Sequence, residues 1–142
     1  MRPYLIVLLV LGLSVSLSAQ EPGEFVVIAN PGRSEVSLSH DEVSRIFLRK
    51  EPSWPRGGDA RPVDQNADLP IRDHFSRVMH ERRVQSVLLY WQQQVFSGRG
   101  FPPPVMQSDA EVIDYVARTP GAIGYVSSGI RLAGVKSLRV VD

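Results

Sequence analysis

The chain has 142 residues, with 16 lysines and arginines, 15 aspartates and glutamates, and no cysteine. This length is enough for one hydrophobic core, so we expect a single domain. The near balance of charge argues against nucleic acid as the main partner, because such surfaces need an excess of basic residues. The lack of cysteine excludes a disulfide framework, a thiolate metal site and a lipid-modified N-terminal cysteine.

The first residues have the pattern of a secretory signal peptide. Arg2 precedes an apolar run over residues 4–17, and Ala19 ends a zone of small residues where cleavage is expected. We expect residues 1–19 to be removed, which leaves residues 20–142 as one periplasmic or secreted domain without a membrane span. The alternative is an uncleaved N-terminal anchor, but the run is short for a transmembrane helix.

A strand, a short helix and a loop are the first elements of this domain. The β-branched run at residues 24–29 ends at Asn-Pro-Gly, which predicts a strand followed by a turn. A Ser-x-x-Glu capping box predicts an amphipathic helix over residues 39–48. Residues 50–59 hold two prolines and two glycines, which predicts a loop that Trp54 attaches to the core.

Helices and strands alternate in the rest of the chain. Apolar residues at helical spacing predict one helix that starts at Pro70 and a second over residues 83–96, followed by a Gly- and Pro-rich connector. Another capping box predicts a helix that ends at Pro120, and two strands follow at residues 122–126 and 135–141. This order indicates an α/β domain with a mixed, mostly parallel sheet flanked by helices.

The segment between Arg61 and Pro70 is the candidate functional region. It joins a strand to a helix through polar residues, and the first-turn N–H groups of a helix can bind an anion. Such elbows gather at one edge of an α/β sheet, where ligands usually bind. The alternative is an ordinary helix capped by Asp68, which is the simpler interpretation of this segment alone.

The residues do not favour a catalytic role. Asp64, Asp68 and Asp73 lie near His74 and His80, but the two histidines are six residues apart and do not share a helix face. No acidic residue stands at metal-ligand spacing from them, so solvated helix surface explains both histidines better. Because the sequence also lacks a serine nucleophile elbow and a nucleotide-phosphate loop, we expect no enzyme, no metal and no cofactor.

Four stretches of the sequence resemble the phosphate-binding proteins of ABC transporters. They are IFLRK…SWPRG (residues 46–57), PVDQNADLPIRDHF (62–75), YWQQQVFSGRGFPP (90–103) and TPGAIGYV (119–126). Their order and spacing are similar to the second lobe of these proteins and to small single-domain proteins of the same superfamily. The resemblance implies a type 2 periplasmic-binding fold reduced to one lobe.

The resemblance also implies a phosphate site at the strand-to-helix elbow. In the family, the anion lies on a helix N-terminus that follows a loop of Gly, Ser and Thr and often precedes an arginine. These positions match residues 67–71 and Arg72 here. Gln65, Asn66 and Arg72 are therefore the candidate contacts for phosphate or another small oxyanion.

Several residues of the elbow differ from the family pattern. Leu69 and Ile71 replace hydroxyl side chains, Pro70 replaces a glycine N–H, and the carboxylate of Asp68 would repel phosphate. One helix end and one arginine supply about 2–4 kcal/mol, whereas micromolar affinity needs about 8 kcal/mol. A tight site would need more donors from a second lobe, a second copy or a partner.

Two functions follow from the resemblance. The first is an exported anion-binding-protein-like domain linked to phosphate ABC transport or phosphate sensing, with an ABC permease or a sensor as partner. The second is a non-catalytic interaction module that kept the fold, lost the ligand and docks on an envelope protein through the connector around Phe101.

Overall fold

The computed structural model describes residues 24–142, so the predicted signal peptide at residues 1–19 lies outside it. The strands are β1 (Phe25–Ala29), β2 (Ser37–Ser39), β3 (Arg61–Pro62), β4 (Asp64–Gln65), β5 (Val105–Met106), β6 (Ala122–Ser127) and β7 (Lys136–Val141). The helices are α1 (His40–Phe47), α2 (Pro70–His80), α3 (Val84–Phe96) and α4 (Asp109–Arg118). Within residues 24–142, no helix is both long enough and apolar enough to cross a membrane.

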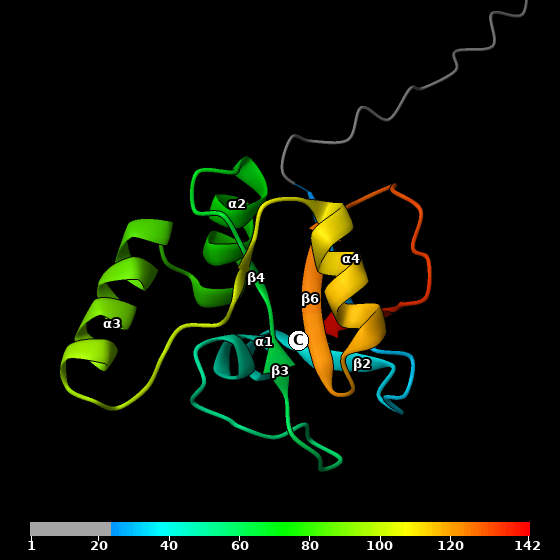
Figure 1. The fold of residues 1–142 in the computed structure, drawn as a ribbon, viewed down its shortest axis with the longest axis horizontal. Helices are drawn as coiled ribbons and strands as arrows, with labels where there is room; N and C mark the ends of the chain where they lie inside the picture. Colours follow the sequence, from blue (N-terminus) through cyan, green and yellow to red (C-terminus); the bar gives the residue numbers. More distant parts are fainter. Residues whose placement is uncertain (1–23) are drawn as a thin grey trace, which may run out of the picture.

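A five-stranded sheet forms the centre of the molecule, with the strand order β2-β7-β1-β6-β3 (Figure 1). β2 is parallel to β7 and β3 is parallel to β6, whereas β1 is antiparallel to both of its neighbours, β6 and β7. Four strands therefore point the same way and the central strand points the other way, which confirms the predicted mixed, mostly parallel sheet. β4 and β5 form a separate parallel pair.

Helices pack on both faces of this sheet. Val27 and Ala29 of β1 contact a core that α1 and α2 share, which contains Phe47 and Phe75. Ile28, on the opposite face of the same strand, belongs to a second core that α4 closes. The alternation arises because successive strand side chains point to opposite faces. The central strand is buried on both sides, which explains why its sequence is a continuous apolar run.

Side chains at the helix N-termini confirm much of the predicted capping. Ser39 Oγ accepts the Glu42 N–H (3.1 Å), and the Glu42 carboxylate accepts the Ser39 N–H (2.8 Å), so α1 begins with a complete capping box. At α4, Ser108 Oγ accepts the Glu111 N–H (3.2 Å), but the Glu111 carboxylate accepts the N–H of Gln107 instead of that of Ser108. In this second capping box, the glutamate therefore binds the residue before the N-cap instead of the N-cap itself.

Trp54 attaches the predicted loop to the sheet, as expected. Its side chain is 2% exposed, and its indole N–H donates to the carbonyl of Gly121 (2.9 Å). Gly121 has a φ of 80°, and a Cβ there would lie 2.3 Å from the carbonyl oxygen of Asp59. Glycine is therefore required where the loop meets the start of β6.

α3 stands beside α2 and away from the central sheet (Figure 1). Its buried residues are Val84, Val87 and Trp91. Val87 and Trp91 pack with Leu48 and Tyr90 in a small core of their own. Leu88 and Val95 also lie at the apolar spacing that predicted this helix, but both side chains are exposed. α3 is therefore packed along one narrow face.

We predict that Gly124→Ala lowers the free energy of unfolding by about 1–3 kcal/mol. Gly124 lies in β6 under α4, and an added Cβ would be 2.8 Å from Val112 Cγ1 and 2.9 Å from Val63 Cγ1. Both neighbours are stiff, buried side chains, so they must shift. Urea denaturation followed by circular dichroism measures the change.

Gly100→Ala is the matched control for this substitution. Nothing lies within 4 Å of a Cβ built at Gly100, so its effect should stay within about 0.5 kcal/mol. Equal stability of the wild type and the Gly124→Ala variant would contradict the close packing of α4 on β6.

Candidate functional site

The elbow between β4 and α2 has the predicted strand-loop-helix form. The N-cap of α2 is Leu69, with extended backbone and no side-chain hydrogen bond, and Pro70 occupies the first turn. The prediction that Asp68 caps this helix is therefore wrong. Asp68 lies one residue too early, and its N–H donates to the side-chain oxygen of Asn66 (2.9 Å) in a turn that orders the loop.

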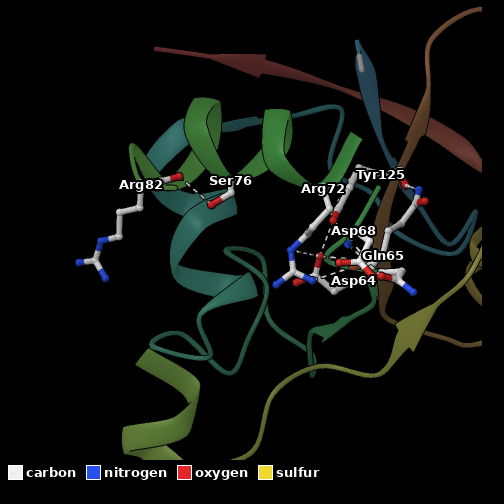
Figure 2. A network of polar contacts seen from close by, with 8 residues as sticks. Asp64, Gln65, Asp68, Arg72, Ser76, Arg82 and Tyr125 are labelled. Carbon is white, nitrogen blue, oxygen red and sulfur yellow. Dashed lines mark hydrogen bonds and ion pairs between the residues drawn. The ribbon is translucent and has the colours of Figure 1, made fainter. Parts of the chain in front are cut away.

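A buried ion pair lies directly behind this loop (Figure 2). The Asp64 carboxylate is 3.2 Å from Nε of Arg72, and both side chains are 5% exposed. The same carboxylate accepts the N–H of Gln65 (3.0 Å) and the hydroxyl of Tyr125. Arg72 also donates from Nη1 to the carbonyl of Gln65 (2.7 Å). The predicted contact Arg72 therefore has a dedicated counter-ion inside the protein.

The protonation states of this network follow from its burial. Burial raises the pKa of the Asp64 carboxyl, while the neighbouring Arg72 guanidinium and the donated hydrogen bonds act in the opposite direction. Burial and the Asp64 charge raise the pKa of Tyr125 well above its ordinary value. The phenol therefore stays protonated and serves as a hydrogen-bond donor to Asp64.

Gln65 points toward α4 and β6. Its side chain is 1% exposed, and its amide donates to the carbonyl of Tyr125 (2.9 Å) and to Oδ1 of Asp109 (3.0 Å). The same oxygen of Asp109 accepts the N–H of Ser127 (3.1 Å). Asp109 is the first residue of α4, so its carboxylate lies at the positive end of that helix. The Asp109 carboxylate therefore already occupies the Gln65 amide, the Ser127 N–H and the N-terminus of α4, three groups that could each bind an anion.

An open pocket of about 390 Å³ lies between the N-termini of α2 and α4. Its lining residues are Gln65, Leu69, Pro70, Ile71, Gln107, Ser108, Asp109 and Ser127. Among the predicted contacts, Gln65 lines the pocket, and Asn66 contacts it through its amide, which donates to Oε1 of Gln107 (2.7 Å). Arg72 is not among the lining residues and pairs with the buried Asp64. The structure thus gathers all three residues at one elbow but gives them different environments.

Asp109 and Tyr125 are the residues of this region that sequence reasoning did not identify. An aspartate just after a serine N-cap is a common first-turn residue, so nothing in the local sequence distinguished Asp109. Tyr125 carried a usable signal, because a tyrosine inside a buried strand must find a partner for its hydroxyl.

The histidines of α2 are not the solvated surface that the sequence predicted. Nδ1 of His80 is hydrogen-bonded to Oγ of Ser44 (2.7 Å), and its ring packs edge-on against Phe75. His74 packs edge-on against Phe25. The prediction failed because α1 and β1 lie beside α2 and cover these side chains. In the described part of the chain, no group of three His, Cys, Asp or Glu residues could hold a metal.

Burial lowers the pKa of His80 to about 4, and the nearby cations Arg72, Arg82 and Lys50 act in the same direction. The ring is therefore neutral at physiological pH. A neutral imidazole can exchange a hydrogen bond with the Ser44 hydroxyl without a buried charge.

Comparison with solved structures shows which fold the chain has. The ABC-type phosphate transport receptor from Vibrio cholerae matches with a TM-score of 0.63 and 15% identity, over 80% of this chain and 44% of that one. PstS from Borrelia burgdorferi gives 0.64 and 14%, over 82% and 46%. A putative phosphate ABC transporter substrate-binding protein with bound phosphate from Clostridium perfringens gives 0.61 and 16%, over 82% and 44%.

The chain has the fold of one lobe of a phosphate-binding protein. It spans less than half the length of these structures, which confirms the predicted single-lobe resemblance and the α/β fold. Two of them are named as a transport receptor and a substrate-binding protein, and none of the three is named as an enzyme. No protein-family model and no curated protein matches the sequence.

We predict that Arg72→Ala lowers the free energy of unfolding by about 3–5 kcal/mol, because it leaves the buried Asp64 carboxylate without its counter-ion. Arg77→Ala is the matched control on the same helix. Arg77 pairs with Asp73 at 2.9 Å, but its side chain is 58% exposed, so we expect a loss below about 1 kcal/mol. Equal losses in urea denaturation would contradict the importance of the buried pair.

We predict that the protein loses stability as the pH falls from about 6.5 to about 4, by up to about 3 kcal/mol from His80. In this window the unfolded chain binds a proton at His80 and the folded chain does not, so protonation favours unfolding. His80→Gln should flatten the pH dependence. His74→Gln, which leaves the Ser44 contact in place, should keep it, and identical profiles for both variants would contradict this assignment.

Proposed function

We propose that the chain is an exported phosphate-binding-protein-like domain that serves phosphate ABC transport or phosphate sensing in the cell envelope. The observation that supports this most is the match of about four fifths of the chain to one lobe of phosphate transport receptors, one of them with bound phosphate. Removal of residues 1–19 would deliver residues 20–142 to the compartment where such receptors meet a permease or a sensor.

The proposed ligand is phosphate or another small oxyanion in the pocket between α2 and α4. Residues at the N-termini of α2 and α4 line this pocket, and Ser108, Ser127 and the nearby amide of Asn66 add polar groups. Arg72 contributes positive potential from behind, although Asp64 neutralises much of it. The Gln65 amide already donates to the Asp109 carboxylate, so an anion that displaced this carboxylate would find the donor in place.

Two features set the expected strength and selectivity of this site. Leu69, Pro70 and Ile71 give the pocket an apolar part. We therefore expect a dissociation constant in the millimolar range, which corresponds to a binding free energy of about 4 kcal/mol. Asp109 can only accept hydrogen bonds while it is ionised. Inorganic phosphate carries a proton at neutral pH and can donate to this carboxylate, whereas sulfate cannot, so the site should prefer phosphate.

We predict that 10 mM phosphate raises the melting temperature of the mature protein by about 4–8 °C, whereas sulfate at equal ionic strength gives a smaller shift. A dissociation constant of about 1 mM corresponds to about 1.4 kcal/mol of stabilisation at this concentration. Differential scanning fluorimetry measures the shift. Asn66→Ala and Arg72→Ala should abolish it, each compared with its own melting temperature without phosphate.

Gln92→Ala removes an exposed amide on α3 and is the control that should keep the full shift. Because Arg72→Ala also destabilises the fold, Asn66→Ala is the decisive variant. A wild-type melt that millimolar phosphate leaves unchanged would overturn phosphate binding.

The second candidate is an interaction module that kept the fold and lost the ligand. It is favoured by the internal partners that already use the donors of Gln65 and Arg72. The connector after α3 would supply the docking surface, since Phe101 is 73% exposed. The phosphate melt separates the two functions, because a module without a ligand predicts no shift in any variant.

A further inference from the structure

An exposed apolar surface runs along the outer side of α3 and into the connector that follows it. Its members, which we call the α3 ridge, are Leu88 (46% exposed), Leu89 (59%), Val95 (46%), Phe96 (83%) and Phe101 (73%). Positions seven residues apart lie almost in line along an α-helix, so Leu88 aligns with Val95 and Leu89 with Phe96, in two rows about 100° apart. Apolar surface of this kind usually marks a binding site.

The ridge is not needed to hold α3 in place. The buried face of the helix packs through Val87 and Trp91 on Leu48, and the Tyr90 hydroxyl donates to the Leu48 carbonyl (2.9 Å). The turn before α3 is fixed separately, because the buried Ser76 hydroxyl donates to a backbone carbonyl in that turn (2.7 Å, Figure 2). The ridge is therefore presented on a helix that is already anchored.

The segment that carries the ridge is cationic. No aspartate or glutamate occurs from residue 82 to residue 107, whereas Arg82, Arg83 and Arg99 lie in this stretch and are all exposed. Within residues 24–142, none of the ion pairs uses these three side chains. Basic charge therefore flanks the apolar face at both ends of α3.

We propose that the α3 ridge docks the protein on an anionic lipid surface. The ridge protrudes, since Phe96 and Phe101 are far more exposed than residues that line a groove, and a lipid interface accepts protruding apolar side chains without a complementary pocket. Arginines beside inserted apolar groups bind anionic headgroups. A second copy fits poorly, because two ridges face to face would bring arginines together without any carboxylate.

Vesicle flotation tests this proposal with the mature protein purified after export. It should float with vesicles of phosphatidylcholine and phosphatidylglycerol (7:3) and much less with phosphatidylcholine alone. Leu89→Ser with Phe96→Ser should reduce binding by at least about tenfold. The matched control, Val36→Ser with Val141→Ser, removes exposed apolar side chains elsewhere and should leave binding unchanged.

A charge series tests the basic flanks separately. Arg82→Gln, Arg83→Gln and Arg99→Gln together should reduce binding to the anionic vesicles by about 100-fold. The control changes Arg61, Arg131 and Arg139 to glutamine, which lowers the net charge equally at exposed positions outside the ridge. This control should lose much less affinity.

Three results would overturn the proposal. They are absence of binding to anionic vesicles, equal loss in the ridge variants and their controls, and a dimer on size exclusion that the ridge substitutions dissociate. The last result would assign the ridge to a second copy. The proposal does not rest on phosphate binding, so the phosphate melt and the flotation assay succeed or fail independently.

Discussion

The buried pair of Asp64 and Arg72 is the contact on which the rest of the elbow depends. It joins the first residue of β4 to the first turn of α2, and the Arg72 guanidinium also donates to the backbone carbonyl of Gln65. With α2 fixed in this way, Phe75 stacks on Tyr125, with ring centroids 3.7 Å apart. A buried ion pair adds little net stability over apolar residues of the same size, so its main effect is to fix one geometry.

The chain has the fold of a phosphate-binding lobe, but carboxylates of the same chain already pair with the donors at its elbow. A binding site for an oxyanion needs donors whose partners are absent until the ligand arrives. Here Asp64 satisfies the buried arginine, and Asp109 satisfies the amide of Gln65 and the N–H of Ser127. Both carboxylates are held by the protein itself, so an incoming anion competes with groups at very high effective concentration.

Local rules predicted much of this fold. The capping serine of α1 and the proline that opens α2 depend on neighbouring residues, and the sequence pattern identified both correctly. Trp54 was identified as the large residue of its loop, but its partner Gly121 lies far away in the sequence. The failures have a common cause in long-range packing. Whether Leu88 is buried depends on how many elements surround α3, and whether His80 meets Ser44 depends on the placement of α1. Asp109 became a partner of Gln65 because α4 and β4 approach each other, which spacing along the chain does not encode.

The position of β1 has a consequence for how the protein folds. Among the strands of residues 24–142 this one is made first, but its partners are β6 and β7, so Phe25 pairs with Ser127 and Val27 with Leu138. The sheet cannot close until nearly the whole chain is available, and such high contact order slows folding. During synthesis β1 is therefore left without either sheet neighbour until first β6 and then β7 have been added.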